Sequence, residues 1–489
     1  MEKSSPSPRL PPSNIHVFAH DDPADLERNI QQLEPKENLL DVSDLGLINS
    51  ERSSSRDPEE RPEPLSRILT NVSSVFRPVD ITSDPGPPPD GGKRAWAQAI
   101  AGHMIVLNTW GYISSFGVFQ TFYTSMLDRS PSDISWIGSV QIFLLFFIGV
   151  LAGRISDAGY FNQLVILGFI LQMIGIFTTS AATQYWQIFL AQGICMGLGN
   201  GCLFCPSLAV VSTYFSKRRA LAIGIMSSGT GVGGLVFPSI ARQLLPSIGF
   251  GWTARTIGFV QLVTLGAALL VLKPRVPPRK SGPLFEFSAF KDAEYSLYVC
   301  GAFFCFLALY FAYYYVASFG REKIGLSYAD GLNLLLVINS VGITGRIAPN
   351  FIADRLGPIT VLIPFALLSG IGMLCWMAVK NVAGLYVWIV FYGTFAGGVQ
   401  SLVPAGLSSL TIDLQKAGVR LGMMFTVMSF AALTGPPIAG QIISAAHGAY
   451  FGAEIFAGIS MLIGSVFFTA AKWAKCRRIE GSSIWTTRV

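Results

Sequence analysis

Charged residues are scarce in this chain. Asp, Glu, Lys and Arg make up 13% of its 489 residues, whereas hydrophobic residues make up 51%. Soluble domains carry about a quarter charged residues, so this composition excludes an ordinary water-facing surface. The mean hydropathy of +0.49 agrees with that exclusion. The sequence therefore predicts a polytopic membrane protein whose main surroundings are a lipid bilayer.

Histidine and cysteine are also few. The 4 histidines are scattered, and the 7 cysteines lie mainly in apolar runs, where they act as small hydrophobic side chains. No nucleophile or metal-ligand pattern emerges, so we expect no enzyme activity, no metal and no cofactor. The net charge of +6 lies at the ends of apolar runs and forms no patch, so we expect no nucleic-acid partner.

The first ninety or so residues contain no long apolar run and are rich in Pro, Ser, Asp, Glu and Arg. Such a segment cannot bury enough apolar surface to offset its chain entropy. We therefore expect a disordered cytosolic tail over residues 1–92. The first twenty residues show no signal-peptide pattern, so the first membrane helix is expected to direct insertion.

Apolar runs of membrane-spanning length begin near residue 95. A bilayer core requires about twenty apolar residues per helix. On this criterion we expect twelve spans, near 95–124, 133–156, 161–183, 185–214, 218–245, 252–272, 294–319, 329–353, 358–379, 384–412, 418–446 and 450–472. The predicted organisation is a six-helix bundle over 93–272, a cytosolic linker over 273–292, a second six-helix bundle over 293–475 and a cytosolic C-terminal tail over 476–489.

Basic residues gather on one side of these twelve spans. An even number of spans puts both termini on the same side, and most of the Lys and Arg residues between spans fall there too. Basic loops stay in the cytosol, so both termini are expected to be cytosolic. We expect the plasma membrane as the location.

Three helix-disturbing residues recur in register. Each pair is separated by 198 positions: Pro206 and Pro404, Gly224 and Gly422, Pro238 and Pro436. Proline and glycine in apolar helices need a packing reason, so this repetition indicates a duplicated half-structure. An offset of six spans makes the two halves parallel repeats, an arrangement found in alternating-access transporters. The predicted fold is thus all-α, with twelve transmembrane helices as two parallel six-helix repeats.

Two motifs narrow the assignment. The first, Asp90-Gly91-Gly92 followed by Trp96, precedes the first span; the second runs from Tyr214 to Gly224 and contains Lys217, Arg218 and Arg219. Together they resemble the monocarboxylate porter family of the major facilitator superfamily, in the form that its fungal members carry. For each of these residues, a topology anchor without a direct role in transport is the alternative.

A loop motif of the superfamily resembles stretches in both halves. One copy contains Asp157 between Gly153 and Gly159, and the other is Ala353-Asp354-Arg355-Leu356-Gly357. The resemblance implies that the motif's acid closes the cytosolic gate by contacting a helix end or a basic residue. The first copy departs from the pattern, because Asp157 stands two residues before its glycine and no arginine follows.

Arg346 is the clearest candidate for a substrate contact. An ionisable group inside a span is costly and indicates function, and a guanidinium can pair with a carboxylate in bidentate fashion. Arg346 shares a helical face with Asn339 and Gly342. In animal lactate carriers of the resembled family the matching arginine binds the monocarboxylate, but their nearby aspartate is Gly342 here, so a different or larger solute is expected. The alternative for Arg346 is an inter-helix brace.

Other polar side chains complete the candidate set. Asn108, Asn200 and Gln400 stand in central spans, and Tyr314, with Tyr310 and Tyr313, is placed to stack on a planar solute. Each alone has helix packing as its alternative role. His103 is a candidate for carrying a proton.

The resemblance implies a secondary carrier that moves a small organic solute by alternating access. We interpret the solute as an organic anion or secondary metabolite, with efflux as one direction and proton coupling as one option. An uptake carrier for a monocarboxylate or riboflavin-like solute is a second interpretation. A non-transporting membrane sensor built on a transporter fold is a third, favoured mildly by the long tail.

Overall fold

The computed structural model describes residues 86–129, 131–277, 285–411, 413 and 416–478. All of them belong to one compact unit, Pro64–Val489. The predicted disordered tail lies outside the described residues up to position 85, and the predicted C-terminal tail lies outside them from position 479.

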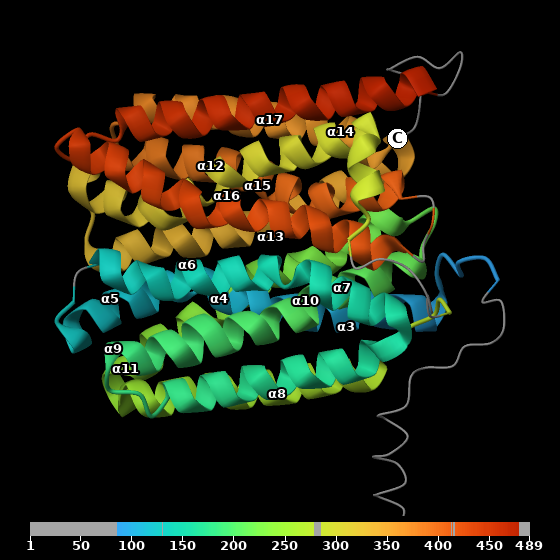
Figure 1. The fold of residues 1–489 in the computed structure, drawn as a ribbon. Helices are drawn as coiled ribbons and strands as arrows, with labels where there is room; N and C mark the ends of the chain where they lie inside the picture. Colours follow the sequence, from blue (N-terminus) through green and yellow to red (C-terminus); the bar gives the residue numbers. More distant parts are fainter. Residues whose placement is uncertain (1–85, 130, 278–284, 412, 414–415, 479–489) are drawn as a thin grey trace, which may run out of the picture. The chain divides into compact units, whose positions relative to one another are not determined.

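The described residues form helices and contain no strand (Figure 1). Up to the middle of the chain the helices are α3 (Gly92–Val106), the π-helix η1 (Leu107–Gly111), α4 (Tyr112–Ser114), α5 (Phe116–Leu127), α6 (Pro131–Phe147), α7 (Gly149–Ile155), the π-helix η2 (Ser156–Tyr160), α8 (Phe161–Thr179), α9 (Tyr185–Ile188), the π-helix η3 (Phe189–Cys195), α10 (Met196–Thr213) and α11 (Arg219–Val271). They are followed by the 3-10 helix η4 (Phe287–Lys291), α12 (Ala293–Ile324), α13 (Tyr328–Leu356), α14 (Pro358–Cys375), the 3-10 helix η5 (Trp376–Ala378), α15 (Val382–Leu410), α16 (Ala417–Ala445) and α17 (Phe451–Arg478).

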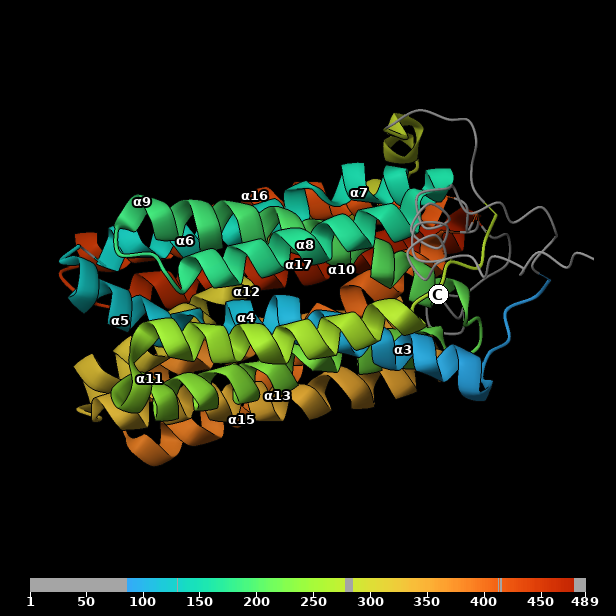
Figure 2. The ribbon, with the colours of Figure 1, turned by 90° about the horizontal axis from the view of Figure 1, so that it is seen from below.

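Within the described residues, 9 helical runs are long and apolar enough to cross a membrane. Two of these runs each contain a glycine with a positive φ, Gly159 at 97° and Gly249 at 74°, and each divides there into two spans. Figure 2 shows α11 doubling back on itself in this way. The stretch from α3 to α5, which η1 interrupts, supplies one further span. Twelve crossings result, which confirms the fold that the sequence predicted.

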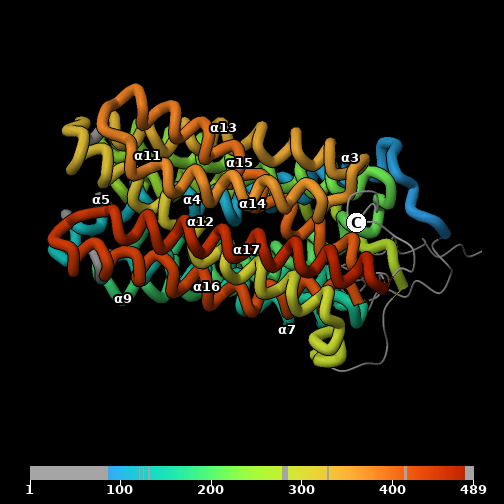
Figure 3. The backbone as a smooth tube through the Cα atoms, turned by 90° about the horizontal axis from the view of Figure 1, so that it is seen from above, coloured from blue at the N-terminus to red at the C-terminus, as the bar shows by residue number. Residues whose placement is uncertain are grey.

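The two ends of the described chain lie at the same end of the helix bundle. Figure 3 shows the blue start of α3 and the red end of α17 there. An ion pair of 2.9 Å between Arg478 and Glu294 brings the start of α12 to the same place. We call this the terminal end and the opposite one the far end. Helix α12 therefore runs from the terminal end to the far end.

The matched glycines of the repeat lie where the two halves touch. A Cβ atom on Gly224 in α11 would come within 2.6 Å of the carbonyl oxygen of Arg346 in α13. A Cβ atom on Gly422 in α16 would overlap the carbonyl group of Gly149 in α7. Both glycines thus permit close approach of backbones, which is the usual role of small residues between membrane helices. The repeat in the sequence corresponds to two equivalent contacts between the halves.

Candidate functional site

A cavity of about 590 Å³ lies between the halves. Its lining comes mainly from α5, from the second half of α12 and from the first half of α13. It extends to Arg321 and Glu322, which are exposed near the far end of α12, and its inner end reaches Arg346. The cavity is therefore open toward the far end of the bundle.

Arg346 lies at the inner end of this cavity and is 1% exposed. Its Nη2 donates to Oε1 of Gln400 at 2.8 Å, and Nε2 of Gln400 donates to the hydroxyl of Tyr313 at 3.2 Å. Within the described residues, Nε and Nη1 of Arg346 have no hydrogen-bond partner. A buried charge without compensation costs several kcal/mol, so this guanidinium has both the charge and the free donors to receive an anion.

A missing side chain makes room for the guanidinium. A Cβ atom on Gly342 would lie 2.5 Å from Nη1 of Arg346, and one on Gly397 in α15 would lie 3.5 Å from it. Arg346 thus occupies the space that a side chain at position 342 would need.

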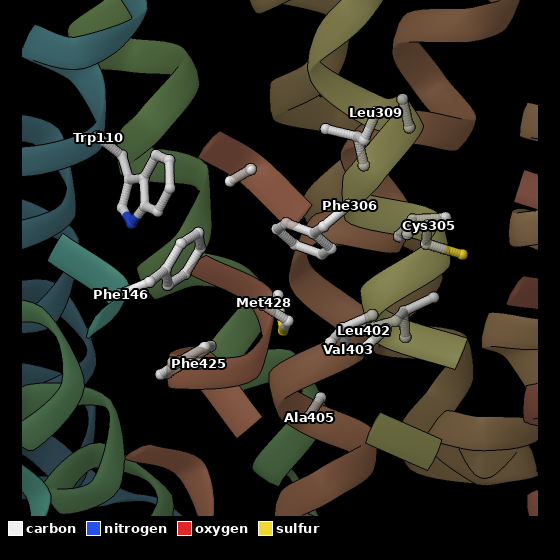
Figure 4. Close-up of a cluster of buried hydrophobic side chains, with 14 of the residues drawn as sticks. Trp110, Phe146, Cys305, Phe306, Leu309, Leu402, Val403, Ala405, Phe425 and Met428 are labelled. Atoms are coloured by element: carbon white, nitrogen blue, oxygen red, sulfur yellow. The ribbon is translucent and has the colours of Figure 1, made fainter. Parts of the chain in front are cut away.

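Five aromatic side chains, together with Tyr310, line a second cavity of about 30 Å³ that also reaches Arg346. We call them the aromatic floor: Trp110, Phe146, Phe204, Phe306 and Phe425. Ring centroids are 5.0 Å apart for Trp110 and Phe146, and 5.3 Å apart for Phe146 and Phe425, which comes from the other half. Figure 4 shows Trp110 and Phe146 on one side and Phe306 on the other. The floor is therefore built jointly by both halves.

Four of the six predicted substrate contacts meet in the cavity. Its lining includes Arg346, Asn339, Gln400 and Tyr314. Sequence reasoning did not select Trp110, although a tryptophan in the middle of a polar stretch of an apolar span was a weak signal for it.

The other two predicted contacts lie elsewhere. Asn108 is fully buried, and its Nδ2 donates to the hydroxyl of Thr264 in α11 at 2.8 Å. Asn200 is fully buried in α10, and neither polar atom of its side chain has a partner within the described residues. His103 lies away from the cavity as well, with Nδ1 2.9 Å from the carbonyl oxygen of Ile225.

Two carboxylates join the halves at the terminal end. Asp354, at the end of α13, accepts hydrogen bonds from the backbone N–H groups of Ala220 at 2.8 Å and Leu221 at 3.1 Å, in the first turn of α11. Asp157, in η2, accepts from the N–H of Val419 at 3.0 Å, in the first turn of α16. An anion at a helix N-terminus is stabilised by the free N–H groups and the helix dipole. We call these contacts the two latches.

The latches differ in local detail. Asp157 lies in a π-helical turn, and this irregular turn accompanies its shorter spacing to Gly159. Arg355 is exposed, and its guanidinium lies 5.0 Å from the ring of Phe351, whereas Asp354 bonds to Ala220 and Leu221.

The two motifs of the resembled family meet each other. The carboxylate of Asp90 accepts hydrogen bonds from the N–H groups of Ser216 and of Lys217, the latter at 2.6 Å. The ring centroid of Trp96 lies 5.0 Å from that of Phe215. Residues that are more than a hundred positions apart therefore form one structure at the terminal end.

Arg219 connects this structure to the second half, whereas Lys217 and Arg218 are exposed. Nε of Arg219 donates to the carbonyl oxygen of Phe215 at 2.9 Å. Nη1 of Arg219 donates to the carbonyl oxygen of Ser408, in the last turn of α15, at 2.8 Å. A cation at a helix C-terminus is favourable because carbonyl groups there lack helical partners. Gly91 is the N-cap of α3, which begins at Gly92.

A cluster of ion pairs holds the segment between the halves. Glu286 pairs with Lys416 at 3.0 Å and with Arg420 at 3.2 Å, and Arg420 also lies 3.7 Å from Asp292. Burial alone would raise the pKa of Glu286, but hydrogen bonds and charges from Arg420 and Lys416 outweigh it and hold that pKa below its usual value. This cluster fixes the segment to the start of α16.

A bundle of twelve spans, with a cavity between duplicated halves that is closed at one end, defines a secondary transporter. The chain belongs to the Major Facilitator Superfamily, whose profile matches residues 102–411. It is 51% identical over 425 residues to an MFS-type transporter of Gibberella zeae, covering 86% of this chain and 95% of the relative. It is 34% identical over 403 residues to the aspyridones efflux protein of Emericella nidulans, covering 82% of each.

A solved structure agrees on the fold. The human organic anion transporter MFSD10 superposes with a TM-score of 0.63 at 14% identity, covering 77% of this chain and all 100% of the other. At this identity the likeness shows the fold alone. The chain is thus a transporter of the superfamily.

Proposed function

We propose that this chain is a carrier of the monocarboxylate porter type that exports a small organic anion, which Arg346 binds. The observation that carries the proposal is the state of the Arg346 side chain. It is 1% exposed, its Nε and Nη1 have no partner within the described residues, and no carboxylate there forms an ion pair with it. An anionic solute would compensate the buried charge and supply the missing acceptors.

The name of a relative supports export, and the basic residues indicate the orientation. Most basic residues between the spans fall on the side of the termini, which makes the terminal end the cytosolic one. The far end then faces outward, so the structure is an outward-open state, which importers and exporters both adopt. The relative in Emericella nidulans is named as an efflux protein, which favours export. The proposed location is the plasma membrane.

The transport cycle follows from the contacts between the halves. When both latches open and the aromatic floor parts, the cavity becomes accessible from the cytosol. An anion then reaches Arg346, and the halves rock about it until Asp354 and Asp157 regain the helix ends of α11 and α16. The solute leaves through the far end. Binding shifts this equilibrium only as far as the solute's affinity differs between the two states.

The test compares an anionic and a neutral probe of one shape. Full-length protein in lipid vesicles is assayed for counterflow of benzenesulfonate, which is permanently charged, and for binding of neutral benzenesulfonamide. We expect Arg346→Gln to reduce benzenesulfonate flux by roughly 100-fold, because a charge-assisted pair is lost from a buried site. Arg355→Gln is the matched control and should retain flux, since that side chain is exposed. Unchanged benzenesulfonate flux in Arg346→Gln would refute the proposed role.

A further inference from the structure

Two aromatic rings face the cavity from opposite halves. Trp110, in η1, and Tyr310, in α12, both line it. Their ring planes are parallel to within 1°, with centroids 6.0 Å apart. Aromatic rings attract one another in offset parallel or edge-to-face arrangements with centroids roughly 4.5–7 Å apart. Trp110 and Tyr310 therefore present two parallel aromatic rings at the inner end of the cavity.

The backbone holds Trp110 in place. Its π-helical segment is a rare geometry that frequently marks functional positions. The next residue, Gly111, lies so close to α11 that a Cβ atom there would come within 2.5 Å of Cα of Gly233. The ring also contacts Phe146, with centroids 5.0 Å apart, and Phe204, with centroids 5.8 Å apart. Contacts with α11, Phe146 and Phe204 thus hold Trp110 in place, and its ring also lines the cavity.

The anion-binding guanidinium is tied to the same aromatic surface. Nη2 of Arg346 donates to Gln400, which donates to the hydroxyl of Tyr313. The ring of Tyr313 lies beside that of Tyr310, with centroids 6.4 Å apart. These contacts link Arg346 to Tyr310 through Gln400 and Tyr313. They therefore fix the distance between the site for an anionic group and the site for an aromatic ring of the solute.

We propose that the cavity selects planar aromatic anions. The ring of the solute stacks on the pair formed by Trp110 and Tyr310, and its anionic group pairs with Arg346. This inference rests on the proposed anion site and adds the solute class. Because the two rings belong to different halves, an aromatic solute contacts both halves, whereas an aliphatic anion of equal charge relies on Arg346 alone.

The experiment uses two probes of equal charge and nearly equal size. Benzenesulfonate is planar and aromatic, and cyclohexanesulfonate is neither. Binding of both to full-length protein in lipid nanodiscs is measured by titration. For the natural chain we expect at least about tenfold tighter binding of benzenesulfonate. Trp110→Leu and Tyr310→Leu should each reduce that ratio to about twofold or less, with binding of cyclohexanesulfonate unchanged.

Controls separate stacking from general packing. Trp110→Phe keeps an aromatic ring and should restore most of the ratio. Trp136→Leu alters a tryptophan that is 47% exposed on α6 and should leave the ratio as it is in the natural chain.

Each outcome has a defined meaning. If the natural chain binds both sulfonates equally well, the aromatic selection is overturned, while the anion site stands. If it binds neither, the proposed function itself fails. The measurement on the natural chain decides the inference even when the leucine variants do not fold. If Trp110→Leu folds and the ratio persists, Trp110 has no part in selecting the solute.

Discussion

The terminal end and the cavity of this transporter follow different rules of symmetry. At the terminal end each half supplies an acid for the other half's helix, Asp354 for α11 and Asp157 for α16. Among the described residues that line the cavity, Arg346 is the one buried charge; it stands in the second half, and 198 positions earlier the sequence has Ile148. The contacts that we propose to serve motion therefore occur in both copies, and the contact that we propose to serve recognition occurs in one.

The largest effect on flux is expected from substitutions that block the close approach of the halves. Leucine at Gly224 or at Gly422 would meet the backbone of the opposite half. Such overlap costs about 3 kcal/mol, so either substitution should lower flux by roughly 100-fold. Counterflow of benzenesulfonate in vesicles measures the effect.

The control for these variants is a glycine without a close neighbour. A Cβ atom on Gly266 in α11 would meet nothing within 4 Å, so Gly266→Leu should keep nearly normal flux. If Gly422→Leu also keeps it, the symmetric close contact is not needed for transport.

The latches themselves test whether the two copies are equal. Asparagine at Asp354 or Asp157 removes the charge at a helix N-terminus, worth about 0.3–2 kcal/mol. The state open at the far end should become roughly 2- to 30-fold less populated, with the larger change for Asp354→Asn because it accepts from two N–H groups.

The population of the state open at the far end can be measured by labelling a cysteine in the cavity. A cysteine in place of Ser318, which lines the cavity, reports access from the far end through its rate of labelling by an impermeant maleimide. The exposed Cys300 and Cys375 are first replaced by serine. Labelling that is equally fast with and without both latches would show that they do not hold this state.

The contact between the two family motifs should affect folding and leave recognition intact. Asp90→Asn removes a charged acceptor for the N–H groups of Ser216 and Lys217, so we expect a loss of about 1–3 kcal/mol of stability. Thermal unfolding in detergent measures this loss. Flux per folded molecule should stay within about twofold of the natural value, and a larger drop in that flux would assign Asp90 to the transport cycle.

The smallest effect concerns Glu286, whose pKa is lowered in the folded protein by Arg420 and Lys416. A lowered pKa stabilises the fold above the unfolded value, which is about 4.3 for a glutamate, and this contribution is lost as pH falls through the folded pKa. The exposure of its partner Lys416, whose side chain is 33% exposed, limits this contribution to about 1 kcal/mol. Glu286→Gln should therefore lower the melting temperature at pH 7 and make little difference below the folded pKa, at about pH 2. A deficit of equal size at both values would contradict the ionic origin.

The sequence predicted what depends on local patterns. Apolar length identified the spans, and the register of Pro206 with Pro404 identified the duplication. A charge inside an apolar run led to Arg346, which the structure places at the inner end of the cavity. Each of these signals is a pattern of residue types along the chain, so one sequence is sufficient to read it.

Such patterns could not predict contacts between segments that are distant in the sequence. Asn108 has the same composition signal as Asn339, yet it bonds to Thr264, while Asn339 lines the cavity. The pairing of Asp90 with the loop at Lys217 depends on how two helix ends pack, which neither segment encodes alone. The position of Trp110 depends on the π-helical turn that contains it, and no residue type in the sequence predicts that turn.

That turn also determines which kinds of sequence change the first span can accept. A π-helical turn holds one residue more than an α-helical turn. Deleting one residue from Leu107–Gly111 would turn this segment into an ordinary α-helical turn, and the residues after it would keep their faces of the helix. Gln120 and Thr124 would then stay in the cavity wall. We expect a single-residue deletion here to displace the side chains of the turn itself, Trp110 among them, and to leave the rest of the span in register.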